Sequence, residues 1–308
     1  MDNTQLAPPL SMPQAWLESL RLRTLPLACA SIITGSALAW HQGHFDPSIA
    51  LLALLTTTLL QILSNLANDY GDALKGSDTP QRIGPLRGMQ KGAITKEQMR
   101  IALMLTVAIT TGCGLLLILR ACQSPADILG FVAMGALAIV AAIAYTVGKK
   151  PYGYLGLGDL SVMIFFGWLG VIGSSYLQTH QIDLLLLLPA SGCGLLATAV
   201  LNVNNLRDID SDRQNGKFTL AVRLGAHGAR RYHAVLLTIA LACFALYSAL
   251  VGLRPVGWLF LLAAPLLWQQ GRFILRETSA LAMRPMLEKT VKAALLINIL
   301  FAAGLMFS

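Results

Sequence analysis

Long apolar stretches, each of roughly 18 to 24 residues, recur along this chain and constrain its fold more than any other feature. A helix needs about 20 apolar residues to cross the hydrocarbon core of a bilayer. The composition agrees, because 55% of the 308 residues are hydrophobic and only 12% are charged. The pattern predicts an all-α polytopic membrane protein with nine spans, at about residues 22–40, 47–67, 99–120, 125–147, 159–178, 183–204, 231–252, 255–270 and 290–307.

The basic residues are strongly one-sided. If alternate loops face opposite sides, 21 of the 23 Lys and Arg residues lie on one side, and only Arg120 and Arg254 lie on the other. Positive charge is concentrated in cytoplasmic loops. We therefore expect a multi-pass protein of the bacterial cytoplasmic (inner) membrane with a cytoplasmic N-terminus. The net charge of +8 then reflects topology, and no nucleic-acid partner is expected.

Six of the 15 acidic residues gather in two clusters, each directly after an apolar span. The first cluster begins at Asn68 and the second at Asn204. Acidic side chains at the edge of a membrane are costly and usually mark a function. Both clusters fall in the long loops expected on the cytoplasmic side, at about 68–98 and 205–230, and long loops often carry function. The working face is therefore expected to be cytoplasmic.

A faint internal repeat links the two clusters. Asn68 and Asp72 recur as Asn204 and Asp208, both displaced by 136 residues. A four-helix unit used twice, followed by one last helix, accounts for the nine spans. This arrangement predicts a single domain, residues 1–308, in which two carboxylate arms meet across a central cavity of the helix bundle.

The spacing within each cluster favours a shared face. On a continuous helix, Asn204, Asp208 and Asp212 lie on one side, and Asn68 and Asp72 stack one turn apart. The alternative is that such residues only cap helix ends and bind their own backbone, and this applies most to Asp69 and Asp210, which point away from that face.

The first cluster is less regular, because Gly71 and Gly76 are expected to interrupt it and Asp78 to return from a loop. Asp and Asn oxygens are hard ligands that suit Mg²⁺, which binds one or two carboxylates together with phosphate oxygens of a substrate. We therefore predict two Mg²⁺ ions bridged by a diphosphate. Their protein ligands are predicted to be Asn68, Asp72, Asp78, Asn204, Asp208 and Asp212.

Basic residues near the clusters provide counter-charges for a diphosphate. The predicted diphosphate ligands are Arg21, Arg82, Lys149, Lys217 and Arg223. The alternative is that these cations only set the topology or face lipid headgroups.

These residues resemble the UbiA superfamily of intramembrane aromatic prenyltransferases. Its signature, Asn-x-x-x-Asp-x-x-x-Asp, is intact at Asn204, Asp208 and Asp212. The first motif departs from that form, since five residues instead of three separate Asp72 from Asp78. The resemblance extends from about residue 16 to the last span and implies a UbiA-like bundle of nine transmembrane helices.

The departure resembles one branch of the superfamily, the 1,4-dihydroxy-2-naphthoate polyprenyltransferases of menaquinone biosynthesis. The segment Asn-Asp-Tyr-Gly-Asp from Asn68 is similar to that branch, as is Arg-Leu-Arg-Thr-Leu-Pro from Arg21, with Leu22 where the branch has proline. The resemblance implies Mg²⁺-dependent transfer of a polyprenyl group from its diphosphate to 1,4-dihydroxy-2-naphthoate. Diphosphate and CO₂ leave, and the product is demethylmenaquinol.

The resemblance also implies catalytic roles. Asp72 and Asp208 would hold the metal-bound diphosphate, Lys149 would stabilise it as it leaves, and Tyr145 would contact it or flank the allylic cation. Asp159 is expected either to orient the hydroxyl groups of the acceptor or to cap a helix.

Other functions remain as alternatives. Within the enzyme class, the acceptor could be 4-hydroxybenzoate, homogentisate or a haem vinyl group. An ion-coupled transporter would also contain carboxylates near the membrane and an internal repeat. Against transport, the outer loops are almost bare and no span carries a charge at its middle.

Overall fold

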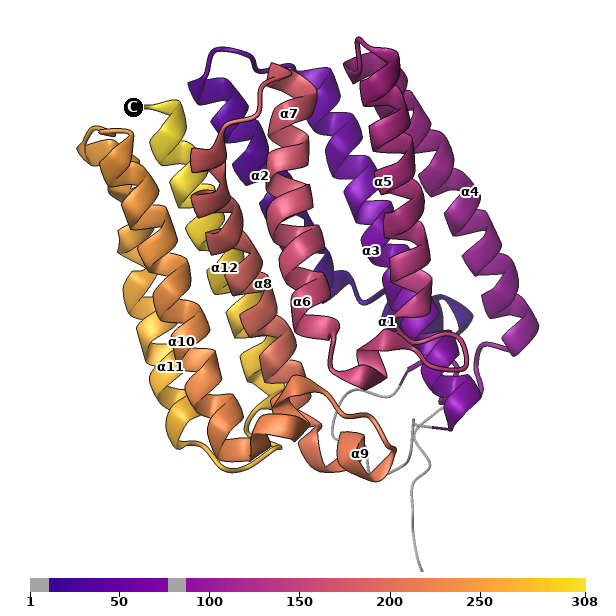
Figure 1. Ribbon diagram of the computed structural model, residues 1–308. Coiled ribbons are helices and arrows are strands. Elements are labelled where there is room, and N and C mark those ends of the chain that lie inside the picture. Colours follow the sequence, from indigo (N-terminus) through magenta and orange to yellow (C-terminus); the bar gives the residue numbers. More distant parts are fainter. Residues whose placement is uncertain (1–10, 77–86) are drawn as a thin grey trace, which may run out of the picture.

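The computed structural model describes residues 11–76 and 87–308, and every regular element in this part of the chain is helical (Figure 1). Nine helical segments, some of them built from consecutive helices, run between the two ends of the molecule. The elements that build these segments are α1 (Met12–Leu20), α2 (Leu25–His41), α3 (Pro47–Lys75), α4 (Lys96–Ala121), α5 (Pro125–Ala144), α6 (Gly158–Val162), η3 (Met163–Ile172), α7 (Gly173–Thr179), α8 (Leu187–Arg207), α10 (Leu220–Leu250), η5 (Pro255–Ala263), α11 (Ala264–Arg276) and α12 (Arg284–Met306). Four short elements of the described residues join them: η1 (Leu22–Thr24), η2 (Tyr152–Leu155), η4 (Leu184–Leu186) and α9 (Ile209–Gln214).

Capping residues define the limits of α3, the helix that bears the first acidic cluster. The Asp46 carboxylate precedes the helix and accepts hydrogen bonds from the backbone N–H groups of Ser48 and Ile49. Gly76 ends the helix in a left-handed conformation with φ of 65°, which glycine adopts without steric cost. The helix therefore continues to Lys75, beyond the predicted end of the span at residue 67.

Eight helical segments among the described residues are long and apolar enough to cross a membrane, and the chain is a multi-pass membrane protein. They correspond to eight of the nine predicted spans. The remaining predicted span, residues 255–270, is also helical, as η5 and α11. Its second half is more polar, with Gln269, Gln270 and Arg272 close together. The segment is therefore helical as predicted, but it is less uniformly apolar than a membrane span was expected to be.

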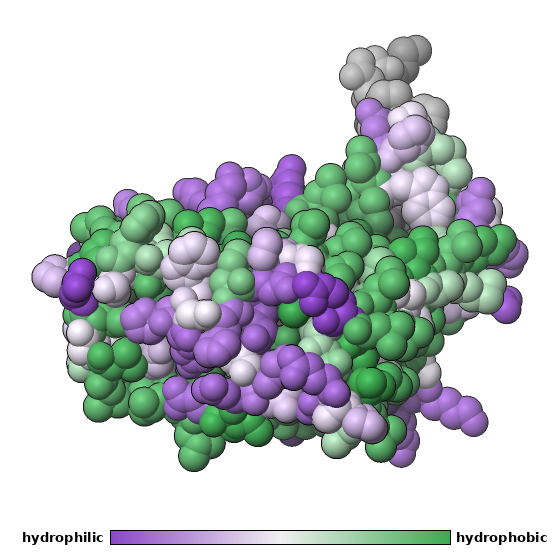
Figure 2. All heavy atoms as spheres, turned by 90° about the horizontal axis from the view of Figure 1, so that it is seen from above, coloured by the Kyte–Doolittle hydropathy of each residue, from purple (hydrophilic) through white to green (hydrophobic). Residues whose placement is uncertain are grey.

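The outer surface is apolar where lipid is expected. α5 contains no buried residue, and large side chains such as Leu119 and Leu129 are mostly exposed. In the view onto the end that carries the C-terminus, polar side chains gather over the middle of the face and apolar side chains surround them (Figure 2). Soluble monomers rarely expose apolar surface on this scale.

Small residues allow the interior helices to approach closely. A Cβ atom on Gly167 of η3 would lie 2.7 Å from the carbonyl oxygen of Ala190 and 2.9 Å from the Cα atom of Gly194, both in α8. A Cβ atom on Gly35 of α2 would meet Ser174 of α7. Such contacts are typical of packed membrane helices. η3 itself is a π-helix, a conformation that often occurs near functional sites.

Both acidic clusters lie at the same end of the molecule. α3 and α8 end beside η2 and α9, whereas the C-terminus lies at the opposite end (Figure 1). α3 packs on α4, and α8 packs on α10, which is the pattern of neighbours that a repeated four-helix unit would give.

Candidate active site

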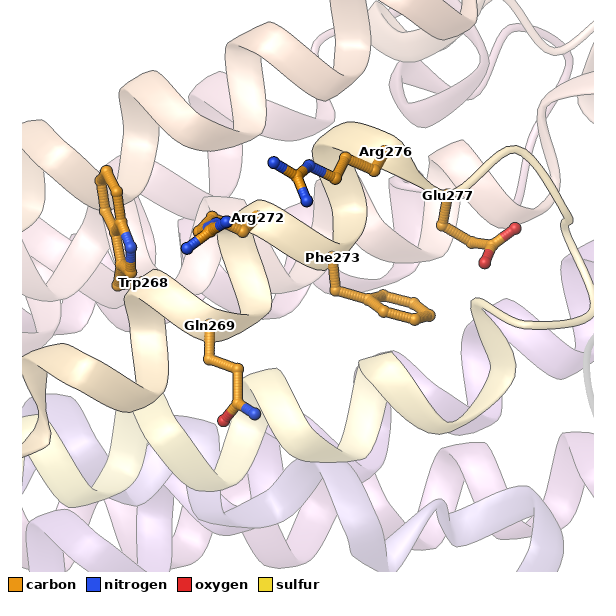
Figure 3. Close-up of a pocket in the computed structure, with 6 residues that line it drawn as sticks. All are labelled: Trp268, Gln269, Arg272, Phe273, Arg276 and Glu277. Atoms are coloured by element: carbon orange, nitrogen blue, oxygen red, sulfur yellow. The ribbon is translucent and has the colours of Figure 1, made fainter.

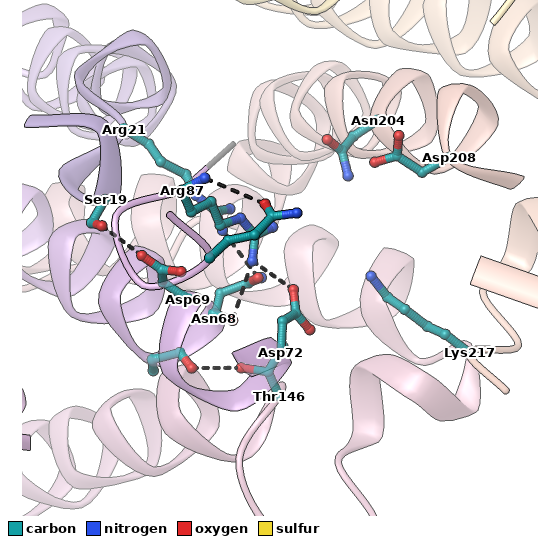
Figure 4. A network of polar contacts seen from close by, with 12 residues as sticks. Ser19, Arg21, Asn68, Asp69, Asp72, Arg87, Thr146, Asn204, Asp208 and Lys217 are labelled. Carbon is teal, nitrogen blue, oxygen red and sulfur yellow. Dashed lines mark hydrogen bonds and ion pairs between the residues drawn. The ribbon is translucent and has the colours of Figure 1, made fainter. Parts of the chain in front are cut away.

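The first acidic cluster lies on the last turns of α3, where two arginines bind it (Figure 4). Asn68 and Asp72 are one turn apart on a continuous helix. Arg87 Nη1 donates a hydrogen bond to Asp72 Oδ2 at 2.6 Å, and Arg21 Nη2 donates one to Asn68 Oδ1 at 3.1 Å. Asp72 is only 4% exposed, so the guanidinium of Arg87 compensates a buried charge.

Arg21 reaches Asn68 from a backbone conformation that is unfavourable for its residue type. It ends α1 with φ of 50° and ψ of 54°, the left-handed region that favours glycine. Non-glycine residues in this region are often found at functional sites. Nearby, the hydroxyl of Ser19 donates to Asp69 Oδ2 at 2.5 Å and so ties α1 to α3. Asp69 thus links two helices, a contact different from the helix cap considered from the sequence.

Gly71 does not interrupt the cluster, and that expectation was wrong. It lies inside α3, where a Cβ atom would be 2.7 Å from the backbone carbonyl carbon and oxygen of Thr146. The Thr146 hydroxyl donates to the carbonyl oxygen of Ala67 at 3.0 Å. The missing side chain therefore lets the turn after α5, which contains Tyr145, pack directly on the first acidic cluster.

The second acidic cluster lies where α8 bends into α9. Asn204 belongs to α8, Asp212 belongs to α9, and Asp208 separates the two helices with φ of −97° and ψ of 12°. The single continuous helix considered from the spacing is therefore not formed. Arg207 holds the bend: its Nε and Nη2 atoms donate to Asp208 Oδ1 and Oδ2 at 2.8 and 2.6 Å, and Nη2 also donates to Asn204 Oδ1 at 2.8 Å.

Tyr154 and Lys217 lie between the two clusters. The Tyr154 hydroxyl donates to Asp72 Oδ1 at 2.9 Å. Lys217 Nζ is 3.5 Å from Asp212 Oδ1 and 5.7 Å from the centroid of the Tyr154 ring. In Figure 4, Asp72 and Asp208 project from opposite helices toward a common space, and Lys217 points into it. The two arms therefore face each other at one end of the bundle.

The charges of this site perturb one another. Burial is the main cause that raises the pKa of Asp212 to about 6; Asp208 and Asp72 raise it further, and Lys217 opposes them. Burial alone would lower the pKa of Lys217, but Asp212 and Asp72 outweigh it, so that pKa is raised. Lys217 is therefore a stable cation, and Asp212 is a carboxylate that needs additional positive charge to ionise fully near pH 6.

Tyr145 contacts the site from the end of α5. Its ring packs edge-to-face on Tyr152, with the centroids 5.3 Å apart. Burial raises the pKa of Tyr145, and the negative charges of Asp159, Asp212 and Asp72 raise it further. Tyr145 is therefore within electrostatic reach of both acidic clusters and remains a neutral hydrogen-bond donor.

Two predicted diphosphate ligands are not brought to the clusters. Lys149 is exposed in the turn after α5 and, within the described part of the chain, makes no polar contact with either cluster. Arg223 is also exposed, and its guanidinium donates to the carbonyl oxygens of Phe218 and Leu155 at 3.2 and 3.0 Å. Arg223 therefore ties the start of α10 to η2, because its Nε and Nη2 atoms donate to these backbone carbonyls.

Two further predicted residues, Asp78 and Arg82, lie outside the described residues. Sequence reasoning missed the roles of Tyr154 and Arg207. Arg207 directly precedes Asp208, and a charged residue at the end of an apolar span is itself a signal. No comparable signal marks Tyr154, which reaches Asp72 only through the path of the loop between α5 and α6.

A surface pocket of about 450 Å³ lies on α11 and contains no residue of either cluster (Figure 3). Its walls include Trp268, Arg272 and Phe273, and Trp268 is 69% exposed. An aromatic ring and a guanidinium on one outward face are typical of the boundary between lipid and water. The pocket is therefore distinct from the site between the acidic clusters.

Comparison with known proteins agrees with this architecture. A model of the UbiA prenyltransferase family matches residues 28–300. The chain is 64% identical over 300 residues to an Escherichia coli protein named 1,4-dihydroxy-2-naphthoate octaprenyltransferase, with 97% of each chain covered. It is 53% identical to a Haemophilus influenzae protein of the same name, with 94% of this chain and 95% of that protein covered.

Solved structures share the fold at low sequence identity. An apo UbiA homologue from Aeropyrum pernix superposes with a TM-score of 0.61 at 17% identity, covering 97% of this chain and 98% of that one. A UbiA homologue from Archaeoglobus fulgidus bound to GPP and Mg²⁺ superposes with a TM-score of 0.59 at 13% identity, covering 96% and 100%.

Proposed function

The chain belongs to the UbiA prenyltransferase family, and from this premise we propose that it transfers a polyprenyl group from polyprenyl diphosphate to 1,4-dihydroxy-2-naphthoate. Diphosphate and CO₂ are released, and the product is demethylmenaquinol. The observation that carries the proposal is the convergence of Asp72 and Asp208 from two distant helices on a space that also contains Lys217. The names of the relatives at 64% and 53% identity support this acceptor over the others.

A divalent metal fits the donor set of the site. We propose two Mg²⁺ ions, held by Asn68, Asp72, Asp78, Asn204, Asp208 and Asp212. Among the described residues, no three acidic, histidine or cysteine side chains lie close enough to hold a metal without a ligand, but Mg²⁺ needs only one or two carboxylates when phosphate oxygens complete its shell. Asp212 Oδ2 is buried without a hydrogen-bond partner in the described part of the chain, so it can accept a cation. When bound, the metal neutralises charge on the diphosphate.

Lys217 is the best-placed cation for the diphosphate. Its ammonium lies within electrostatic reach of Asp212 and Asp72, and its side chain is only 13% exposed, so its charge acts more strongly than in bulk water. Arg87 binds Asp72 and Arg207 binds Asp208. We propose that these two arginines, together with Arg21, turn toward the diphosphate once metal ions bind the aspartates. Lys149 and Arg82 stay in the proposal as predicted ligands on the sequence pattern alone.

The reaction needs an environment that excludes water. As the allylic C–O bond breaks, the electron pair leaves with the diphosphate and a prenyl group with cationic character remains. Tyr145 is proposed to flank this group, because the face of an aromatic ring attracts cations. The apolar bundle protects the cation from water and accommodates the polyprenyl tail.

An acceptor-by-donor screen on purified protein tests the proposal. Transfer from polyprenyl diphosphate should occur with 1,4-dihydroxy-2-naphthoate and release one CO₂ for each diphosphate, and EDTA should abolish it. Transfer only to 4-hydroxybenzoate or homogentisate would move the assignment to another branch of the family. Diphosphate-independent passage of an ion across a vesicle membrane would favour the transporter.

We propose further that the chain lies in the bacterial cytoplasmic membrane as one unit, with both acidic clusters and the N-terminus facing the cytoplasm. The one-sided distribution of Lys and Arg supports this orientation. Cysteine labelling at Gly43 and Gly216, on the loops at opposite ends, would test it: only a Gly216→Cys variant should be protected from an impermeant reagent in intact spheroplasts.

A further inference from the structure

Asp159 is a buried carboxylate that the metal and diphosphate site does not use. It is 7% exposed, at the start of α6. Neither carboxylate oxygen has a hydrogen-bond partner among the described residues, in contrast to Asp72 and Asp208, which are bound by arginines. Asp159 lies in the first turn of α6 and is not its N-cap residue, which is Leu157. A buried carboxylate with so little hydrogen bonding is costly, so Asp159 can still accept a hydrogen bond from a molecule outside the chain.

Two phenols flank this carboxylate. The Tyr145 hydroxyl oxygen lies 3.0 Å from where a Cβ atom on Gly158 would be, so only glycine allows the phenol to approach the residue before Asp159 so closely. From α10, the Tyr232 hydroxyl faces Asp159 as a weak, long hydrogen-bond donor. The three side chains come from the end of α5, from α6 and from α10, and they form a polar cluster within the helix bundle.

The polar cluster borders the space between the acidic clusters. Tyr145 interacts electrostatically with Asp159 on one side and with Asp212 and Asp72 on the other. A flat aromatic molecule that contacts Asp159 would therefore lie next to the group bound by the aspartates. This is the position that an acceptor needs if a ring carbon is to attack the departing prenyl group.

We propose that Asp159, with Tyr145 and Tyr232 beside it, binds a hydroxyl group of the aromatic acceptor and acts as the base that removes its proton. The inference rests on the proposed function and extends it to the second substrate. In 1,4-dihydroxy-2-naphthoate, the hydroxyl on carbon 1 is adjacent to the carbon that bears the carboxylate. The two phenols supply hydrogen-bond donors for oxygen atoms of the acceptor.

The steps balance without a further reactant. The carboxylate of Asp159 takes the hydroxyl proton, and the electron pair of the O–H bond moves into the ring. The adjacent ring carbon bonds to the prenyl carbon while the C–O bond of the donor breaks and its electron pair leaves with the diphosphate. The bond from that ring carbon to the carboxylate then breaks, CO₂ leaves, and its bonding pair restores the aromatic ring. Asp159 returns the proton to the hydroxyl oxygen.

The test compares Asp159→Asn with Asp159→Glu in the purified full-length protein. Asn keeps the shape but cannot accept the proton, so we expect kcat for transfer to fall about 100- to 1,000-fold, with an unchanged KM for prenyl diphosphate. The Asn variant should gain rate as the pH rises toward the pKa of the acceptor hydroxyl itself, whereas the wild type levels off. Glu should recover at least tenfold of the lost rate.

A binding measurement separates this inference from the proposed function. Farnesyl thiolodiphosphate, a donor analogue that does not ionise readily, should bind Asp159→Asn and wild type equally well with Mg²⁺ present. Loss of that binding would indicate a structural role and overturn the inference. A rate for Asp159→Asn within threefold of wild type, with the same pH profile, would also overturn it. If the wild type itself fails to prenylate the naphthoate but prenylates another phenol, the proposed acceptor is wrong, and the same variants then test the base with that phenol.

Tyr232→Phe provides a second variant in case Asp159→Asn does not fold. It removes one hydroxyl and leaves the ring in place, so we expect the KM for the naphthoate to rise about threefold to tenfold, with the KM for the donor unchanged. Unchanged constants for both substrates would count against the polar cluster as the acceptor site.

Discussion

The two Asn-x-x-x-Asp motifs hold their aspartates in different ways. In the second motif, Arg207 directly precedes Asp208 and binds both of its oxygens. In the first motif the position displaced by the same 136 residues is Gly71, and the arginine that binds Asp72 is Arg87, from the other side of the loop. The Asn and Asp residues therefore recur in both motifs, but the arginine that binds the aspartate comes from a different place in the chain.

The packing around each motif explains this difference. A side chain at position 71 would collide with the backbone of Thr146, so the turn that contains Tyr145 requires glycine there. At position 207 there is room for a buried arginine, which holds the bend between α8 and α9. Both aspartates are therefore held by an arginine, but the first motif takes its arginine from a distant residue because a packed turn occupies the adjacent position, and the second takes its arginine from the adjacent residue.

The largest expected effect is loss of either aspartate. Asp72→Asn and Asp208→Asn should each lower kcat/KM for transfer at least about 100- to 1,000-fold, because each removes charge from the proposed metal and diphosphate site. Asp210→Asn, on the exposed face of the same short helix as Asp212, is the matched control and should stay near wild type. An assay of demethylmenaquinol formation measures all three. If only one motif were sensitive, the two arms would not share a ligand.

The next largest effect is expected on the free energy of unfolding of the metal-free protein when an arginine beside an aspartate is replaced. Arg207→Gln should destabilise the protein by about 3–5 kcal/mol, because it removes the guanidinium that binds both oxygens of the buried Asp208 carboxylate. Arg87→Gln should act similarly on Asp72. Adding Mg²⁺ with a prenyl thiolodiphosphate should recover much of the loss, as seen by thermal unfolding in detergent. The double variant Arg207→Gln with Asp208→Asn should be more stable than Arg207→Gln alone; equal stabilities would show that the pair is not the cause.

A smaller effect should distinguish packing from charge. Gly71→Ala should cost about 1–3 kcal/mol, because the methyl group would overlap the backbone of Thr146. Gly130→Ala, in α5 with open space around its Cβ position, should be neutral or stabilising by up to about 1 kcal/mol. Unfolding followed by the fluorescence of the tryptophans gives both values. Equal effects of the two substitutions would mean that the turn does not depend on Gly71.

The smallest effect is a shift in pH dependence. Because the pKa of Asp212 is raised to about 6, protons compete with metal below that pH, and the apparent Mg²⁺ affinity should fall up to about tenfold per pH unit. Lys217 lowers this pKa, so in Lys217→Met the fall should begin at higher pH. Lys75→Met, which removes a cation over the same tyrosine ring, is the control and should leave the onset unchanged. Metal titrations between pH 5 and 8 would detect the shift.

Much of the molecule was predictable from local patterns. The positions of all nine helical segments followed from the apolar stretches, and Asn68, Asp72, Asn204 and Asp208 stood out because carboxylates and amides at the ends of such stretches are costly. The bend at Asp208 and the continuity of α3 through Gly71 were not predictable, because both depend on what packs against the helix.

The sequence by itself determined that the chain spans a membrane and that two acidic motifs follow apolar spans. Both features depend on neighbouring residues along the chain, namely the length of an apolar stretch and the charges at its end. Only the tertiary structure decided which side chains meet. It brought Tyr154 and Lys217 between the motifs and turned Arg223 toward backbone carbonyls. It also placed the buried Asp159 carboxylate beside two phenols. Those contacts join residues far apart in the chain, and they form only when the packing of the helices sets their distances.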